Sequence, residues 1–306
     1  MDRYNKLSNY LKYRFGERVL KICIDGGFTC PNRDGTKGLG GCSFCSEKGS
    51  GEHLHSYQNI PSQVQNYFKS YKADRANKFI VYFQNFTNTY DSLENLKQKY
   101  DSALIDERIV GIAIATRPDC IDEKIVKLIK SYSNKYYVWV ELGLQTANEK
   151  TGISINRCYS NCDFTNAVNL LNKYKIDVVA HIMIGLPNET FSDLQNTVSF
   201  INQHNIQGIK IHSCYVVNGS KLAIQYLNGS YLPLTLEEYI SSVCYVLTCI
   251  NPNIIVHRIS GDAPKDLLLA PEWNFHKKWI INGINKKLKD ENMYQGMNNT
   301  NNIIIK

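Results

Sequence analysis

The sequence has no long hydrophobic run and no secretory leader. No apolar stretch reaches the roughly 18 residues that a membrane span requires. The first 21 residues, MDRYNKLSNYLKYRFGERVLK, are charged and polar throughout, where a secretory signal would carry an apolar segment. We therefore expect a cytoplasmic protein with no membrane partner.

A strong excess of one charge is also lacking. The 306 residues include 35 Lys and Arg and 28 Asp and Glu, which gives a formal net charge of +7. This mild basicity is compatible with an RNA partner, but it does not by itself indicate one. The 43% hydrophobic content is that of an ordinary globular protein with a sizeable core. Ten cysteines in a reducing compartment favour metal binding or redox chemistry over disulfides.

What the sequence does contain is a regular alternation of strand-like and helix-like segments. Near-continuous apolar runs, typical of buried parallel strands, occupy residues 18–25, 78–84, 109–116, 136–145, 176–187, 206–217 and 253–262. Helix-like segments occupy residues 61–73, 91–104, 121–133, 163–175, 190–205, 235–250 and 272–291. Six or seven such βα units predict an α/β fold with a parallel sheet, and they fit a partial TIM-type (β/α) barrel better than an open sheet.

We expect three parts along the chain. These are an N-terminal segment over residues 1–17, the partial barrel over 18–220 and an α/β extension with helices over 221–306, packed on the barrel. In parallel α/β folds the reactive groups lie at the carboxyl ends of the strands. Polar motifs follow the predicted strands here too, among them NFTNTYD, TRPD, QTANEKTGISINR, GLPNE and HSCYVVNGS.

The loop after the first predicted strand contains three closely spaced cysteines. Cys30, Cys42 and Cys45 form a C-x11-C-x2-C pattern in CPNRDGTKGLGGCSFC, a stretch of turn formers and charges. Unliganded cysteines usually lie in apolar segments, which this loop is not. Three thiolates bind an iron–sulfur cluster, or zinc with a fourth ligand, for which His53 or His55 is available. The residues themselves leave both metals open.

The sequence resembles the radical S-adenosylmethionine (radical SAM) superfamily, in its YtqA/YhcC-like branch, which is related to the radical domain of Elongator-type proteins. The resemblance covers nearly the whole chain and rests on ordered motifs. They are DGGFTCPNRDGTKGLGGCSFCSEKGSG (25–51), YFQNFTNTY (82–90), IATRPDC (114–120), VELGLQTANEKT (140–151), AHIMIGLPNET (180–190), GIKIHSCYVVNGS (208–220), HRISGDAP (257–264) and APEWNFHKKW (270–279). The common superfamily spacing is C-x3-C-x2-C, and this chain has the longer first gap of its branch.

The resemblance implies an enzyme in which Cys30, Cys42 and Cys45 hold an oxygen-sensitive [4Fe–4S] cluster with one open iron. In such enzymes the amino and carboxylate groups of S-adenosylmethionine (SAM) chelate that iron. An electron from a reductant such as flavodoxin or ferredoxin then breaks a C–S bond, and the 5′-deoxyadenosyl radical abstracts hydrogen from an unactivated carbon. The implied substrate is tRNA, in which a carboxymethylaminomethyl side chain of the wobble uridine becomes aminomethyl.

The resemblance also implies which residues hold SAM. Gln145 of LGLQ and Arg157 of INR carry over, the arginine as the partner of the methionine carboxylate. His181 stands where relatives have an acid that contacts the ribose. Among the polar residues at other strand ends, we expect Thr116 and Asn85 to face the cofactor.

Several other residues have two interpretations. Glu141 lies among apolar strand residues, so its carboxylate must be paired, either within the protein or with a ligand. His212 and His257 end predicted strands and serve either in proton transfer or, more simply, in the structure. Cys158 and Cys162 form a C-x3-C, which we interpret as free thiols rather than a second metal site.

Two other functions stay open from the sequence. One is the same radical chemistry on a small molecule or a protein. The other is a non-enzymatic zinc-binding module that binds RNA. The basic stretches HKKW (276–279) and INKKLKD (284–290) are typical of a solvated helix face, and they would also suit an RNA backbone.

Overall fold

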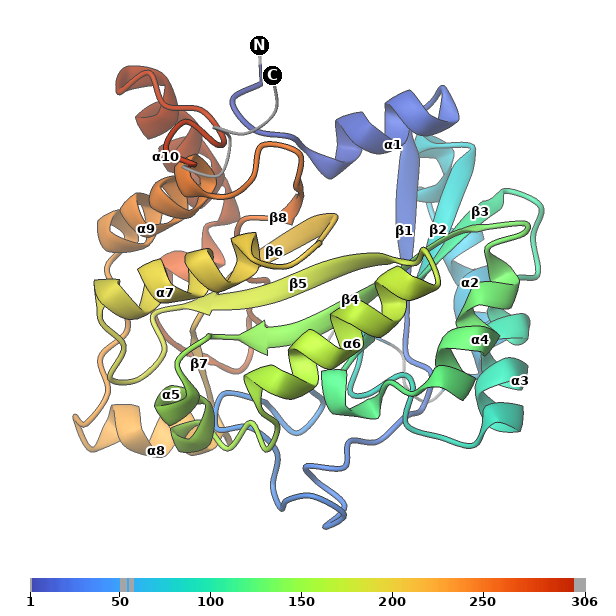
Figure 1. The fold of residues 1–306 in the computed structure, drawn as a ribbon, viewed down its shortest axis with the longest axis horizontal. Coiled ribbons are helices and arrows are strands. Elements are labelled where there is room, and N and C mark those ends of the chain that lie inside the picture. Colours follow the sequence, from blue (N-terminus) through green and yellow to red (C-terminus); the bar gives the residue numbers. More distant parts are fainter. Residues whose placement is uncertain (1, 50–53, 55–57, 300–306) are drawn as a thin grey trace.

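The computed structural model describes residues 2–49, 54 and 58–299, which form a curled parallel sheet of seven strands in the order β1-β2-β3-β4-β5-β6-β8 (Figure 1). The strands are β1 (Val19–Ile24), β2 (Lys78–Phe83), β3 (Ile109–Thr116), β4 (Tyr137–Gln145), β5 (Asp177–Ile184), β6 (Gly208–Ser213) and β8 (Ile255–Arg258). Each lies within a predicted strand. The predicted α/β partial TIM-type barrel is confirmed.

Six helices on the outer side of the sheet, and a seventh that packs on the last of them, lie close to their predicted ranges. They are α2 (Ile60–Phe68), α3 (Leu93–Ala103), α4 (Glu123–Tyr132), α6 (Asn161–Lys173), α7 (Phe191–Asn202), α9 (Leu236–Cys249) and α10 (Lys277–Asp290), which packs on α9. Side-chain oxygens cap the first turns of five of them, which fixes where these helices begin. The capping residues are Asn59, Ser92, Asp122, Ser160 and Thr235.

Shorter elements complete the fold. The helices α1 (Leu7–Phe15), α5 (Glu149–Ser154) and α8 (Lys221–Leu227) were not predicted. A two-stranded antiparallel pair joins β7 (Val216–Val217) to β9 (Leu268–Ala270). Single 3-10 turns lie at Ala73–Arg75, Pro118–Cys120 and Glu272–Phe275. No helix in the described ranges is both long enough and apolar enough to cross a membrane.

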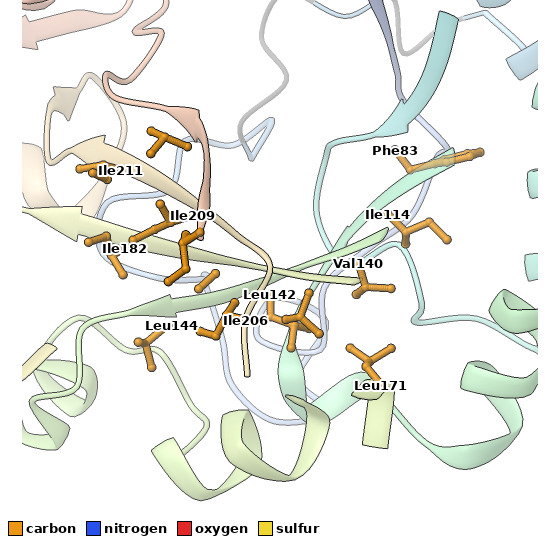
Figure 2. Close-up of a cluster of buried hydrophobic side chains, with 14 of the residues drawn as sticks. Phe83, Ile114, Val140, Leu142, Leu144, Leu171, Ile182, Ile206, Ile209 and Ile211 are labelled. Atoms are coloured by element: carbon orange, nitrogen blue, oxygen red, sulfur yellow. The ribbon is translucent and has the colours of Figure 1, made fainter. Parts of the chain in front are cut away.

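The main hydrophobic core lies between the sheet and the outer helices. Figure 2 shows part of it, in which Ile114, Val140 and Ile182 project from neighbouring strands and Leu171 comes from α6. All four are buried. Burying one such side chain is worth roughly 1.5–3 kcal/mol, so this layer holds each strand against its helix.

The inner face of the sheet is apolar at one end only. At the amino-terminal end, Leu7 and Leu11 of α1 pack with Trp139 and close the barrel. In Figure 1, α1 lies at the upper edge, whereas the segment after β1, drawn in blue, lies at the lower edge. Toward the carboxyl ends of the strands, inward-facing positions become polar, as at Gln145 and His212. The fold therefore leaves a polar cavity at the end where the sequence motifs gather.

The residues just before α1 cover one edge of the sheet. Lys6 forms a parallel bridge with Val256 of β8, and the Val256 N–H donates to the Asn5 carbonyl at 2.7 Å. β8 is the seventh strand of the barrel sheet, although it lies beyond the predicted domain boundary at residue 220. The boundaries at residues 17 and 220 stay predictions.

Candidate active site

A cavity opens at the carboxyl ends of the strands, and the three predicted cysteines line it. Cys30, Cys42 and Cys45 share its wall with Gln145 and with residues from β2, β3, β4, β5, β6 and β8. The cavity encloses about 950 Å³, including its open mouth.

The cysteine-bearing loop is wound tightly by its glycines. Gly40 and Gly41 both have left-handed backbones, with φ of +76° and +75°. The left-handed φ at Gly41 favours glycine, and a Cβ there would also stand 2.9 Å from Arg33 Nε, so the arginine side chain would have to move. At the start of the loop, the Arg33 N–H donates to the Cys30 carbonyl at 2.8 Å. These turns bring the C-x-x-C to the same wall as Cys30.

The surroundings of the thiols suit metal-binding thiolates. A hydrogen bond between the two thiols raises the pKa of Cys42 and lowers that of Cys45. Asn32 Nδ2 donates to Cys42 Sγ at 3.6 Å, and the Arg33 guanidinium places positive charge beside Cys45. N–H donors and nearby cations stabilise the thiolate, which is the form that binds iron or zinc.

The thiols share a wall without forming a closed site. Within residues 2–49, 54 and 58–299, no three His, Cys, Asp or Glu side chains are grouped closely enough to hold a metal ion. His53 and His55, the predicted alternative zinc ligands, lie outside the described residues. Cys158 and Cys162 are exposed and form no disulfide within the described residues.

Three of the five predicted cofactor residues line the cavity. Gln145 ends β4 in a left-handed conformation, with φ of +67°, and forms part of the wall. His181 and Thr116 are also on the wall, with Thr116 Oγ1 hydrogen-bonded to Thr89 Oγ1 at 2.6 Å. Asn85 is not on the wall. It is 2% exposed, and its Nδ2 donates to Asp25 Oδ2 at 3.1 Å.

Arg157 is also absent from the wall, which corrects the role predicted for it. Its side chain is fully buried, and all five N–H groups donate within the protein. The acceptors are the carbonyl oxygens of Leu144, Thr146 and Tyr159, Glu149 Oε2 and Asn161 Oδ1, at 2.8 to 3.1 Å. No donor is left for a cofactor carboxylate. The geometry makes Arg157 a clamp that joins the end of β4 to α5 and α6.

The floor of the cavity holds a buried ion pair. Glu141 of β4 is fully buried and accepts hydrogen bonds from Trp139 Nε1 at 2.9 Å, from His181 Nε2 at 2.8 Å and from Lys210 Nζ. Burial opposes its ionisation, but the Lys210 charge and the His181 hydrogen bond outweigh burial and hold the Glu141 pKa well below its usual range. Burial lowers the pKa of Lys210 to about 7. Of the two interpretations of Glu141, pairing within the protein is the one seen.

Several lining residues were missed by the sequence reasoning. They are Arg33, Tyr159, Lys210 and Arg258. A signal for Lys210 was present in the strand periodicity, because it precedes His212 by two residues and alternate strand residues share a face. Lys210 is therefore expected to point into the barrel on the same face of β6 as His212.

Comparison with known proteins gives the family. The model described as "Radical SAM superfamily" matches residues 30–201, and "Radical_SAM C-terminal domain" matches residues 206–290. The chain belongs to the radical SAM superfamily. YtqA of Bacillus subtilis is 40% identical over 303 residues, covering 96% of this chain and 92% of YtqA. YhcC of Escherichia coli K12 is 34% identical over 270 residues, covering 88% and 87% of the two chains.

A solved structure agrees on the fold. The Elp3 protein of the archaeon Methanocaldococcus infernus, lacking residues 1–46, superposes on this radical SAM chain with a TM-score of 0.70 at 17% identity. The match covers 90% of this chain and spans 64% of that one. The predicted placement in the YtqA/YhcC branch, with a relation to Elongator-type proteins, is confirmed. Radical SAM membership implies SAM and a [4Fe–4S] cluster as cofactors.

Proposed function

We propose that this radical SAM enzyme holds its [4Fe–4S] cluster through Cys30, Cys42 and Cys45 and acts on tRNA. The proposed reaction converts the carboxymethylaminomethyl side chain of the wobble uridine to aminomethyl. The observation that carries the cluster assignment is the placement of three thiols on one wall, at the carboxyl end of a radical SAM barrel. When bound, the cluster and SAM would supply a radical that abstracts hydrogen from an unactivated carbon.

The protein's own residues fit this assignment. Asn32 and Arg33 place N–H groups and positive charge at the thiols. Gln145 and Thr116 offer polar groups on the same wall, where SAM would lie. Thr87 lines the cavity with an Oγ1 that is buried and has no partner in the described structure. Such an atom is costly unless a ligand satisfies it.

Relatives support RNA as the substrate class. A protein named tRNA uridine(34) acetyltransferase, from Methanocaldococcus jannaschii, is 26% identical to this chain over 213 residues. The match covers 67% of this chain and 36% of that protein. Uridine 34 is the wobble position, so the relative's name agrees with the proposed substrate, although its transferase reaction is a different one. The net charge of +7 agrees with a polyanionic partner.

The first experiment tests the cluster. Protein reconstituted anaerobically with iron and sulfide is expected to turn brown and to bind about four irons per chain. With SAM and dithionite it should form 5′-deoxyadenosine. A variant with all three cysteines changed to Ala should do neither. A colourless wild-type protein with one zinc would overturn the radical assignment and favour the zinc-binding RNA module.

The second experiment tests the substrate. tRNA from a strain that lacks this enzyme is incubated with the reconstituted protein, SAM and reductant, and its nucleosides are analysed by mass spectrometry. We expect carboxymethylaminomethyluridine to decrease as aminomethyluridine appears. Formation of 5′-deoxyadenosine without any change in the tRNA, together with no RNA binding at low salt, would favour a small-molecule or protein substrate.

A further inference from the structure

The cavity carries its positive charge in two separate places. Arg33 and Arg117 lie at the mouth, where their charges act on the thiols of Cys45 and Cys30. A second group, which we call the floor cations, consists of Lys21, Lys210 and Arg258. Lys210 and Arg258 line the cavity, whereas Lys21 lies behind its lining, over the Tyr82 ring at 5.0 Å, and borders a separate pocket beside Leu7 and Leu11.

The floor cations are not balanced by the carboxylates around them. Glu141 is paired with Lys210, and it is the fully buried carboxylate of this group. Arg258 pairs with Asp262 at 2.9 Å, but Asp262 is 41% exposed and also pairs with Lys277 at 2.6 Å. Lys21 forms no ion pair within the described residues. Three cations therefore face two carboxylates, one of them shared with a fourth cation.

Nearby histidines do not change this balance. Burial lowers the pKa of His181, His212 and His257, so all three are neutral at neutral pH. Burial also lowers the pKa of Lys21 and Lys210, so Arg258, whose side chain is 23% exposed, is the cation of this group that stays fully charged at neutral pH. An anion that reaches Arg258 and Lys210 would gain charge-assisted hydrogen bonds from them.

The floor also has hydrogen-bond donors that the described protein leaves unused. Lys210 has three N–H groups and two partners, Glu141 and the Tyr82 hydroxyl at 2.9 Å. Arg258 has five N–H groups and one ion-pair partner in the described residues. His212 Nε2 is buried on the cavity wall and has no partner there. Lys210 and Arg258 therefore have donors for one more acceptor, and His212 Nε2 can supply another in the tautomer that carries its proton there.

The depth of Lys210 separates it from the cysteine loop, whereas His212 stands one residue from the end of β6. Lys210 precedes the end of β6 by three residues, which places it about 10 Å below the strand end. The cysteine loop follows the end of β1, at the mouth. SAM held at a cluster on those thiols would lie toward the mouth, on the side of Arg33, because Arg117 is already paired with Asp119 at 2.9 Å. The floor cations are left for a different anion.

We propose that Lys210, Arg258 and His212 form a receptor for a carboxylate carried by the substrate. The substrate class is then a molecule with a carboxylate-terminated side chain long enough to enter the barrel. This inference rests on the proposed function and deepens it, because the carboxymethyl group would be the part of the uridine side chain that is anchored.

The test compares two synthetic anticodon stem–loop RNAs that differ only in the wobble side chain, carboxymethylaminomethyl or aminomethyl. Dissociation constants are measured by fluorescence anisotropy with the reconstituted protein. The wild type is expected to bind the carboxylate RNA at least about tenfold more tightly, which is the effect of one charge-assisted hydrogen bond. Arg258→Gln should reduce the preference to about threefold or less.

Two further variants sharpen this test. Removing Lys210 alone would strand the buried Glu141, so the double variant Glu141→Gln/Lys210→Met is used, which leaves the net charge unchanged. It should lose the preference through its missing N–H contact. The matched control is Lys124→Met, which removes an exposed lysine on α4 and should change the affinity for both RNAs equally.

Other outcomes separate this inference from the proposed function. If neither RNA binds, the same proteins are titrated with N-benzylglycine and benzylamine. A wild-type preference for N-benzylglycine that Arg258→Gln removes would keep the receptor and reject the tRNA. A wild type with no preference for either carboxylate probe overturns the receptor. The receptor is also overturned if Arg258→Gln weakens SAM binding, measured by equilibrium dialysis, as strongly as it weakens RNA binding.

Discussion

Replacing Arg157 tests whether the side chain holds the fold or the cofactor. Arg157→Met removes five hydrogen bonds and leaves the buried carbonyls of Leu144 and Thr146 without the donors that lie 2.8 Å away. Each buried unsatisfied acceptor costs about 1–3 kcal/mol, so the free energy of unfolding should fall by about 4 kcal/mol. With an unfolding entropy of about 2.1 cal/mol/K per residue, a chain of this length should lose about 6 °C in Tm.

The assay is thermal unfolding of the cluster-free protein, followed by circular dichroism. A second variant disturbs the hydrogen bonds of Arg157 without replacing the arginine itself. The guanidinium lies against Gly152, where a Cβ would stand 2.9 Å from Arg157 Cζ, so Gly152→Ala should also lower the Tm. SAM affinity measured well below the Tm should change little in either protein. If Arg157→Met unfolds within about 1 °C of the wild type and loses SAM binding, the clamp is wrong and the sequence-based role is right.

Three further predictions concern other buried groups. Burial raises the pKa of Glu189 from 4.5 to about 7. The contribution of Glu189 to stability is therefore fully present below pH 4.5 and is lost as the pH rises through 7. In urea unfolding, Glu189→Gln should be about 1–3 kcal/mol more stable than the wild type at pH 8 and equal to it near pH 4. Gly38→Ala would place a Cβ 2.2 Å from the buried Asn32 Oδ1, so the reconstituted variant should bind less iron, and an unchanged iron content would contradict this role for Asn32. Tyr100 is fully buried and donates to the Asn88 carbonyl at 2.6 Å, so Tyr100→Phe should lower the unfolding free energy by about 1–2 kcal/mol, whereas a loss below about 0.5 kcal/mol would show that the bond contributes little.

The strands were predictable because their signal is local. Buried parallel strands are apolar on both faces, so each run is visible without knowledge of its neighbours. The helix α1 was missed for the opposite reason. Only Leu7 and Leu11 of its nine residues are buried, and its place depends on packing across the barrel end. Such tertiary contacts leave little trace in the sequence pattern.

The candidate site was also predictable only in part. The cysteine loop could be located from spacing and residue type, and the structure brings all three thiols to one cavity. The direction of a side chain could not be read from type alone. Arg157 was expected at the cofactor, yet its donors all turn inward. Lys210 was passed over, although it stands on the cavity floor.

The short stretch that pairs with β8 has a consequence for self-association. An open barrel leaves an outermost strand with unpaired N–H and C=O groups, which is a template for strand addition by another copy. Here the Val256 N–H is already taken by the Asn5 carbonyl, and the bridge at Lys6 continues this cover. A chain shortened to begin at Leu7 would uncover that edge. Light scattering should show dimers or larger aggregates of this shortened chain at concentrations where the intact chain shows no increase in size.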